Sequence, residues 1–536
     1  MQSASTALRT SEPVYRAWKF VEGLANDAAK VLERWKYLFL LVCTGCYALI
    51  TCYQANRKLF WADEIFTVYV SGLPSLRLIW NALLDGADYN PILLYVLTHF
   101  SEAILGPTHL GARLPGILGF WILCLCLFRF VAIRSSALAG FVSMSFPLAT
   151  TVYLYSFEAR AYGTVLGFCG LALISWQALT SAEKGRFWLA LGLFASLACA
   201  LLTHGYAFLV FVPFVAGELA RSIFRRSIDW IVWLALIAAG LAMVASLPAL
   251  IALRSLLGVG QVLLPTVTKL LRTYGSLLGP AATFTTFVLG LVFVDFVRRQ
   301  VSSGHLDAAS RNDGIQKQSF KLHEKVALVG FLTIPFFSYM ASRLSGAPMM
   351  DRYSLATVAG IAALVGMAAG KRAVTGLLAL AVLSALLAGQ FMNFRHTFEM
   401  KEPSSGLMIS TSQSNFNVRY YLMSLEDKEL PIVLLDHMDF AVSMFYAPPE
   451  IVSRLVYLRE GPNIHADSYK NLQKCCGAPG RVETFKEFLG TTKTFLVYTP
   501  SSSYYGTSRF TESGGTVSVK ALTPDYALFQ VTYPPR

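Results

Sequence analysis

The chain has 536 residues, of which 55% are hydrophobic and 14% are charged, and its formal net charge is +13. So low a charged fraction excludes an ordinary soluble domain and indicates a protein embedded mostly in a bilayer. The Lys and Arg residues fall in short loops between apolar runs, where they signal orientation in the membrane. We therefore expect membrane lipids, and no nucleic acid, among its partners.

Residues 1–36 are polar and mixed in charge, and we interpret them as a cytoplasmic N-terminal segment. The first apolar run comes late and lacks a small-residue cleavage pattern, so we expect no cleavable signal peptide.

Apolar runs of about 17 to 25 residues can cross the roughly 30 Å hydrocarbon core as helices. The sequence predicts eleven such crossings within a transmembrane catalytic domain at 37–392 whose first outer loop is 54–112. They lie at about Tyr37–Tyr53, Leu114–Val131, Ala137–Tyr155, Tyr162–Leu179, Phe187–Leu202, Tyr206–Ala220, Trp230–Leu253, Ser276–Val297, Val326–Ser342, Ser354–Gly370 and Ala373–Met392.

The apolar stretch Pro91–Leu105 is short and polar enough to be a helix lying in the membrane interface instead. Eleven crossings with a cytoplasmic N-terminus place the basic loops, such as Arg129 to Arg134 and Arg221 to Arg226, on the cytoplasmic side. A twelfth crossing at Pro91–Leu105 would place all of them outside. We therefore predict eleven.

The composition changes after Met392, where Gly, Ser, Pro and charges replace the apolar runs. We predict an extracytoplasmic soluble domain at 393–536, a small α/β or α+β module, in which the short strands expected are Pro431–Leu435, Ile451–Leu458, Thr494–Tyr498 and Ala527–Tyr533. We interpret Asp436-His437, after the first strand, as a strand-end loop rather than a catalytic pair.

Two adjacent carboxylates, Asp63 and Glu64, follow the first crossing. Each ionised side chain near hydrocarbon costs roughly 2.5–3.5 kcal/mol, so such a pair at the membrane boundary indicates function. The alternative is that they cap the following helix. Capping does not require two acids flanked by Trp61 and Phe66, and we favour a catalytic role.

Further polar residues gather on the same predicted outer face. Arg160 and Arg352 can bind phosphate through their guanidinium groups, or they can pair with Glu158 and Asp351. The other candidates are Tyr162, His204, Tyr353 and Lys58. Tyr162 can instead be a belt aromatic, His204 an ordinary interfacial histidine, and Lys58 a residue that only flanks the first span.

The nine cysteines form no disulfide framework and no Cys-x-x-Cys metal spacing, and no Walker or Rossmann glycine pattern occurs. We expect no cofactor and no metal requirement.

The order of five motifs resembles the GT-C glycosyltransferase superfamily, and more narrowly the protein O-mannosyltransferase, aminoarabinose transferase and RgtA/B/C/D-like group. The motifs are the acidic pair, Tyr89-Asn90-Pro91 before the interfacial stretch, Ala112-Arg113-Leu114-Pro115, Glu158-Ala159-Arg160-Ala161-Tyr162 and Asp351-Arg352-Tyr353. The sequence departs from the group where His-Pro-Pro is common, having Asn90-Pro91-Ile92 instead, and at Ala161, which replaces a proline.

The resemblance implies transfer of a sugar from a polyprenyl-phosphate donor to a glycan, lipid or protein acceptor, with inversion at the anomeric carbon. It implies that Asp63 is the general base and that Glu64 orients the acceptor or Asp63 itself. Arg160 and Arg352, with Tyr162, His204, Tyr353 and Lys58, would hold the lipid phosphate. Trp61 and Asn90 would position the acceptor or the loop.

Two other classes stay open at this stage. A transporter or flippase of a lipid-linked or small polar solute also needs intramembrane charges, although no internal repeat is evident. A scaffold that binds cell-wall material would leave the gathering of polar residues unexplained. The short loops and the small outer domain favour a bacterial inner membrane.

Overall fold

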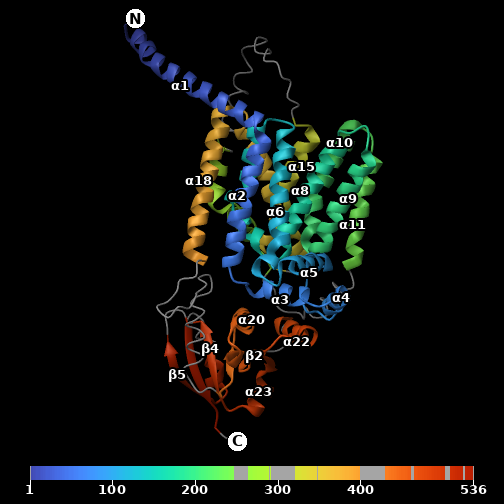
Figure 1. Cartoon of the computed structure of the whole chain (residues 1–536), viewed down its shortest axis with the longest axis vertical. Coiled ribbons are helices and arrows are strands. Elements are labelled where there is room, and N and C mark those ends of the chain that lie inside the picture. The colour runs from blue at the N-terminus through green and yellow to red at the C-terminus, as the bar shows by residue number, and fades with distance from the viewer. Residues whose placement is uncertain are drawn as a thin grey trace.

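The computed structural model describes residues 2–246, 264–288, 290, 320–346, 348–398, 429–459, 464–500, 507–522 and 526–534. A bundle of long helices forms most of the molecule, and a sheet-containing domain lies at one end of it (Figure 1). The N-terminal helix α1 (Gln2–Arg34) leaves the bundle at the opposite end. Three short helices, α3 (Ala62–Ser71), α4 (Leu76–Leu84) and α5 (Ile92–Leu105), lie between bundle and domain.

Six helical stretches of the described ranges are long and apolar enough to cross a membrane, or eight if two bent pairs each form one span. The single stretches are α2 (Lys36–Arg57), α6 (His109–Ala132), α8 (Ala161–Leu179), α9 (Arg186–Thr203), η3 (Gly205–Val210) with α10 (Phe211–Arg225), and α18 (Ala373–Phe398). The bent pairs are α7 (Ala137–Ser145) and η1 (Pro147–Ala149) with η2 (Thr151–Phe157), and α15 (Leu322–Leu332) with α16 (Ile334–Ser345).

All eight coincide with predicted crossings. Two more predicted crossings correspond to shorter helices, α11 (Trp230–Leu241) with η4 (Ala242–Ser246), and α17 (Thr357–Ala369), which follows η6 (Asp351–Ser354). The crossing predicted at Ser276–Val297 lies largely outside the described residues, which include α13 (Val267–Leu278) and η5 (Gly279–Ala281). The number eleven therefore stays a prediction.

Glycines allow the central helices α6 and α8 to pack backbone against backbone. A Cβ added at Gly119 would lie 2.4 Å from the carbonyl oxygen of Gly163, and one added at Gly167 would lie 2.6 Å from the Cα of Gly119. Lipid tails are as apolar as core side chains, so helix association in a bilayer depends on such close contact between small residues.

Substitution of Gly167 by Ala is expected to destabilise the protein by about 1–3 kcal/mol, the usual effect of overpacking a tight interface. Gly45→Ala in α2 is the matched control, because an added Cβ there meets no atom within 4 Å. Thermal unfolding in detergent, followed by tryptophan fluorescence, measures both. Equal unfolding midpoints for the two variants would contradict the close α6–α8 contact.

The helix α5 corresponds to the apolar stretch Pro91–Leu105, which the sequence predicts to lie in the membrane interface rather than to cross the membrane. It has 14 residues, too few to span, and it packs against α3, α4 and the start of α6. Figure 1 shows it beside α3 and α4, at the end of the bundle nearest the sheet domain. This placement agrees with the predicted interfacial helix.

The C-terminal domain contains a six-stranded mixed sheet of order β3-β2-β1-β4-β6-β5. The first four are parallel, and β6 pairs antiparallel with β4 and β5. The strands are β1 (Ile432–Leu434), β2 (Leu455–Arg459), β3 (Arg481–Thr484), β4 (Thr494–Pro500), β5 (Thr516–Leu522) and β6 (Tyr526–Thr532). The helices are α20 (His437–Tyr446), α21 (Pro449–Val452), α22 (Ile464–Cys476), α23 (Phe485–Thr491) and α24 (Ser508–Glu512).

The four predicted strands are present as β1, β2, β4 and β6, but the predicted start of β2 at Ile451 lies in α21 instead. The short β3 and the exposed β5 were not predicted, because neither has a buried apolar run. Asp436 caps α20, with its carboxylate accepting from the backbone amides of Met438 and Asp439. This is a structural role at a strand end, as interpreted from the sequence.

The C-terminal domain is packed firmly against the short outer helices. One continuous apolar core includes Phe66 and Val70 of α3 together with residues of α20, β2 and α22. The Tyr446 hydroxyl accepts a hydrogen bond from the Phe60 amide and bonds to His109 Nε2, both at 2.8 Å. The domain therefore fixes the helix that carries Asp63 and Glu64.

Candidate active site

Asp63 and Glu64 are adjacent on α3 but lie in different environments. The helix begins at Ala62 after an extended Trp61, so the two carboxylates leave it in directions about 100° apart. The Asp63 side chain is 28% exposed, whereas that of Glu64 is fully buried. The two carboxylates therefore differ in what can reach them.

Glu64 forms a two-point ion pair with Arg113 near the start of α6. Arg113 Nε donates to Oε1 at 2.7 Å and Nη2 donates to Oε2 at 2.8 Å. Arg113 also donates to the carbonyl oxygens of Ala55, Lys58 and Leu59, where α2 ends. The Ala159 amide donates to Glu64 Oε1 at 2.6 Å. One buried pair thus joins the end of α2, the start of α3, the start of α6 and the turn before α8.

Burial by itself raises the pKa of Glu64, but Arg113, with smaller contributions from Lys58 and the Ala159 amide, outweighs it and holds the pKa below its ordinary value. Glu64 is therefore ionised and enclosed. The prediction that Glu64 orients the acceptor does not fit this placement, because no acceptor reaches a fully buried carboxylate. The other predicted role, positioning Asp63, does fit.

Removal of either partner of this pair leaves an uncompensated buried charge, which costs about 3–5 kcal/mol. We expect Glu64→Ala and Arg113→Ala each to lower the thermal unfolding midpoint strongly. The control is Asp27→Ala in the exposed Asp27–Lys30 pair of α1, whose loss is expected to leave the midpoint unchanged. Wild-type midpoints for Glu64→Ala and Arg113→Ala would refute the organising role of the pair.

Arg160 supports α3 from the side. Its Nη1 donates to the Asp63 carbonyl oxygen at 3.0 Å and to Thr67 Oγ1 at 3.1 Å, and it pairs with Asp88 Oδ2 at 2.9 Å. The Asn90 amide, oriented with its oxygen toward the guanidinium, accepts from Nη2 at 2.8 Å. Asn90 thus contacts Arg160 from the loop before α5, and its predicted role in positioning the loop or the acceptor stays a prediction. Arg160 is nearly buried and engaged with Asp88, which limits its capacity for a second anion.

Lys58 pairs with Glu158 at 2.9 Å, and both side chains are almost buried. Burial and the charge of Glu64 raise the pKa of Glu158, while Lys58 lowers it, and the net direction is upward. Glu158 Oε2 has no hydrogen-bond partner among the described residues. The predicted alternative pairing of Glu158 with Arg160 does not occur, because Glu158 pairs with Lys58 and Arg160 pairs with Asp88.

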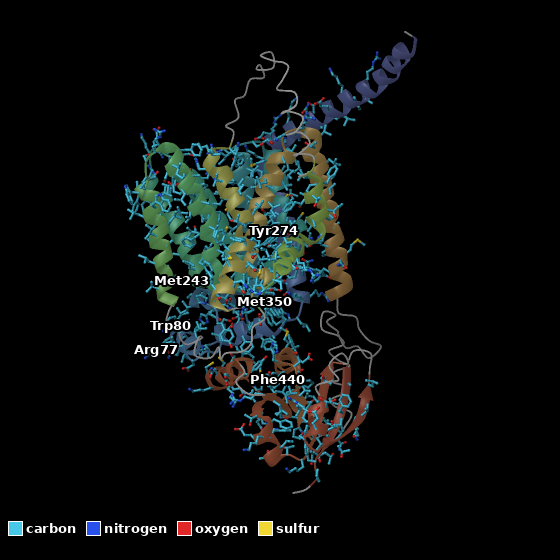
Figure 2. The ribbon with its side chains drawn as sticks, turned by 180° about the vertical axis from the view of Figure 1, so that it is seen from behind. Arg77, Trp80, Met243, Tyr274, Met350 and Phe440 are labelled. Atoms are coloured by element: carbon cyan, nitrogen blue, oxygen red, sulfur yellow. The ribbon has the colours of Figure 1, made fainter. Side chains whose placement is uncertain are left out.

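Asp63 instead faces Arg352 of η6. Arg352 Nη2 lies 3.6 Å from Asp63 Oδ2, and the Arg352 side chain is 24% exposed. The guanidinium lies over the rings of Trp61, at 5.5 Å, and Tyr162, at 5.9 Å. Met350, two residues before Arg352, lies at the end of the bundle that faces the C-terminal domain, in which Phe440 is labelled (Figure 2). The predicted pairing of Arg352 with Asp351 does not form, since Asp351 binds Lys269 at 2.8 Å.

An aromatic cluster extends from Arg352 toward the spans. His204 lies between Tyr162 and Tyr353, with ring centroids 5.6 Å and 5.5 Å away, and Tyr206 stacks on Tyr353 at 3.9 Å. These residues and Arg352 line a small pocket of about 30 Å³. Burial, with the charges of Arg160 and Arg352, lowers the pKa of His204 to about 3, so the imidazole is neutral at pH 7.

The structure thus brings together Asp63, Trp61, Tyr162, His204, Arg352 and Tyr353 at one place, with Arg160 and Asn90 behind α3. Sequence reasoning assigned no role to Arg113, Asp88 or Tyr206. Arg113 lies in one of the motifs that carry the resemblance, Tyr206 begins a predicted crossing, and Asp88 is two residues before Asn90. No local pattern in the sequence identifies the residues that these three contact. Among the described residues, no group of three or more His, Cys, Asp or Glu side chains could hold a metal ion.

No protein-family model matches the chain, and no curated protein matches its sequence. Solved structures of ArnT from Cupriavidus metallidurans do match its fold. The apo structure aligns with a TM-score of 0.57 at 11% identity, covering 93% of this chain and 98% of that one. The structure of ArnT bound to undecaprenyl phosphate aligns with a TM-score of 0.51 at 10% identity, covering 92% and 98%.

The fold is therefore that of a helical bundle with a small C-terminal domain, as in the ArnT structures, and six to eight of its described helical stretches are long and apolar enough to cross a membrane. The particular fold is that of ArnT, over nearly the whole length of both chains. The resemblance to the aminoarabinose transferase group is confirmed at the level of the fold.

Proposed function

We propose that this protein is an inverting glycosyltransferase that moves a sugar from a polyprenyl-phosphate donor to an extracytoplasmic acceptor. The observation that carries the proposal is the pair formed by Asp63 and Arg352. Both side chains are partly exposed, whereas the neighbouring charges are buried and paired, Glu64 with Arg113 and Arg160 with Asp88. The ArnT fold and the undecaprenyl phosphate bound by one ArnT structure support a lipid-linked donor.

Asp63 is suited to act as the general base. An acceptor hydroxyl has a pKa far above 7, so a carboxylate within hydrogen-bond reach must take its proton as the oxygen attacks the anomeric carbon. The Asp63 carboxylate is accessible, and Arg160 and Thr67 hold the first turn of its helix. A single displacement with this base inverts the anomeric carbon.

Arg352 is suited to stabilise the leaving group, a lipid phosphate whose negative charge grows during the reaction. Its 3.6 Å contact with Asp63 is loose for an ion pair of this type. A phosphate that binds Arg352 would draw the guanidinium away from Asp63 and free the carboxylate to accept a proton. Neutral His204, with Tyr162 and Tyr353, would add polar contacts without a second full charge.

The membrane topology in this proposal follows the positive-inside rule. The N-terminus and the basic loops face the cytoplasm, and the C-terminal domain lies outside, most simply at a bacterial inner membrane. Because that domain packs on α3, it is suited to cap the site or to select the acceptor, whether glycan, lipid or protein.

Replacement of Asp63 by Asn is expected to reduce transfer by a factor of about 10² to 10⁴, the range for loss of a general base, without lowering the unfolding midpoint. Transfer from a panel of radiolabelled polyprenyl-phosphate sugars into membrane acceptors measures the effect. Asp85→Asn, an exposed carboxylate in the same outer loop, is the matched control and should transfer as the wild type does. Undiminished transfer by Asp63→Asn would remove Asp63 from this role.

Replacement of Arg352 by Gln is expected to lower transfer at least tenfold, since a charge-assisted hydrogen bond to the phosphate is lost. Product inhibition by undecaprenyl phosphate should weaken in parallel, because donor and product share the phosphate. Arg343→Gln, an exposed arginine at the end of α16, serves as the control. Unchanged product inhibition in Arg352→Gln would show that the phosphate binds elsewhere.

Nothing in the described part of the chain favours the transporter alternative. The buried ion pairs of the bundle among the described residues lie at its two ends rather than along a path through it.

A further inference from the structure

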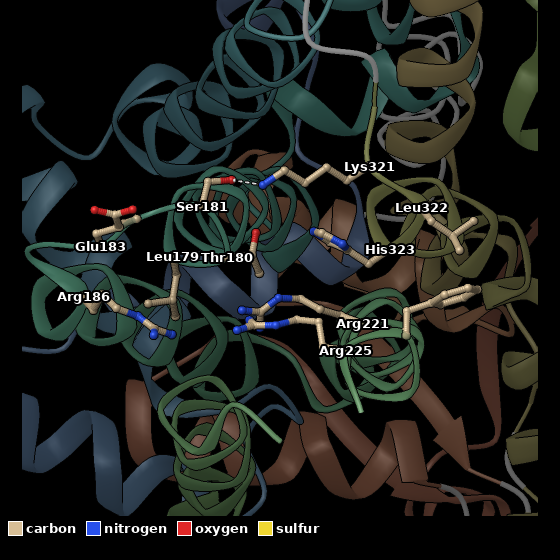
Figure 3. A pocket seen from close by; sticks show the side chains of 12 residues that line it. Leu179, Thr180, Ser181, Glu183, Arg186, Arg221, Arg225, Lys321, Leu322 and His323 are labelled. Atoms are coloured by element: carbon tan, nitrogen blue, oxygen red, sulfur yellow. Dashed lines mark hydrogen bonds between the residues drawn. The ribbon is translucent and has the colours of Figure 1, made fainter. Parts of the chain in front are cut away.

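A large cavity opens at the end of the bundle opposite Asp63. Its volume is about 650 Å³, and it lies where α8 ends, α9 begins, α10 ends and α15 begins (Figure 3). These are the ends predicted to face the cytoplasm. The proposed transferase reaction uses none of its residues.

Basic side chains dominate the polar lining of this cavity. Arg186, Arg221, Arg225 and Lys321 line it, against a single lining carboxylate, Glu183. Figure 3 shows Arg221 and Arg225 side by side, with Arg186 and Lys321 reaching in from different elements. Such a group, gathered from a loop and two helices, is typical of a site for an anion.

Acidic residues behind the lining hold part of this group in place. Asp229 Oδ2 accepts from Arg186 at 2.5 Å and from Arg221 at 2.7 Å, and Glu218 binds Arg221 at 2.7 Å. Two carboxylates therefore fix the orientation of the Arg186 and Arg221 guanidinium groups and neutralise part of their charge.

The other two cations keep most of their binding capacity. Arg225 is 55% exposed and reaches Asp229 only at 3.9 Å, and Lys321 Nζ donates to the neutral hydroxyl of Ser181 at 3.0 Å. Burial and the positive charges of Arg134 and the cavity arginines lower the pKa of Lys321, in spite of Glu324. Arg186 Nε and His323 Nε2 are buried and have no hydrogen-bond partner among the described residues.

Two exposed apolar residues line the cavity beside its basic side chains. They are Phe224 of α10 and Leu322 of α15, which are 72% and 46% exposed. Both stand near the ends of apolar helices, so they can contact acyl chains if those helices cross the membrane. The cavity thus places cations next to apolar side chains that hydrocarbon can cover.

We infer that this cavity binds the phosphate headgroup of an anionic phospholipid from the leaflet on this side of the membrane. Basic pockets between membrane helices are suited to such headgroups. The guanidinium groups take the phosphate oxygens, and the acyl chains lie against Phe224 and Leu322. A bound lipid would link α10 to α15, and it would also counter the repulsion among the cations.

A free phosphate would use the same cations but would gain nothing from Phe224 and Leu322. The experiment therefore compares three probes: phosphatidylglycerol, phosphatidylcholine with the same acyl chains, and inorganic phosphate. Delipidated full-length protein in a neutral detergent is titrated with each, and the thermal unfolding midpoint is recorded, with native mass spectrometry to count bound lipids. The variant is Arg225→Gln/Lys321→Gln, which leaves the buried Asp229 pairs intact.

The matched control is Lys371→Gln/Arg372→Gln, which removes the same charges from an exposed turn at the same end of the bundle but outside the cavity. We expect phosphatidylglycerol alone to raise the wild-type midpoint. The cavity variant should need about 30-fold more of it for the same rise, the effect of two basic residues near an anionic lipid, and the control should match the wild type.

Equal effects of phosphatidylglycerol and phosphatidylcholine on the wild type would overturn the inference, as would an unaltered titration of the cavity variant. A rise of the same size with inorganic phosphate would overturn the lipid assignment and leave a free-anion site. The wild-type comparison of the three probes needs no variant, so it decides the matter even where the double substitution impairs folding.

Discussion

The buried ion pair between Glu64 and Arg113 is the constraint on which the candidate site depends. It joins the loop from the end of α2 to the start of α3 with the start of α6 and the turn before α8, which lie about 50 and 100 residues further along the chain. A buried ion pair contributes little net stability compared with apolar side chains of the same shape. Its contribution is geometric, because two-point contact and three carbonyl acceptors allow one arrangement of these segments.

That arrangement explains how neighbouring carboxylates acquire different properties. Glu64 points into the protein, where Arg113 keeps it ionised, and Asp63 points toward Arg352 and the accessible region. Arg160 holds the Asp63 carbonyl, and the C-terminal domain packs on the far side of α3. Asp63, the proposed base, is thus placed on a first turn that is held by Arg160, by the Glu64–Arg113 pair and by the C-terminal domain, as pre-organised catalysis would require.

The distribution of charge along the bundle follows from the cost of ionised groups in hydrocarbon. In the described ranges the buried ion pairs of the bundle lie at its two ends. The Glu64–Arg113 pair is at one end, and the Arg134–Glu324 and Arg221–Asp229 pairs are at the other. Between them, small residues bring α6 and α8 into backbone contact. The two ends are consequently chemically distinct, one with a pairing of acid and base that suits transfer and the other with an excess of cations that suits an anionic lipid.

The sequence alone determined which segments are apolar helices, that Pro91–Leu105 is too short to cross, that a small α/β domain follows, and that Asp63 and Arg352 belong to one face. These depend on local hydrophobicity, on the positive-inside rule and on resemblance in motif order, all of which are readable along the chain. Only the tertiary structure decided that Glu64 is enclosed by Arg113, that Arg160 pairs with Asp88 and not Glu158, and that Asp351 binds Lys269 and not Arg352. The partner of a charged side chain depends on which segments the folded chain brings within about 4 Å, and no local pattern records that distance.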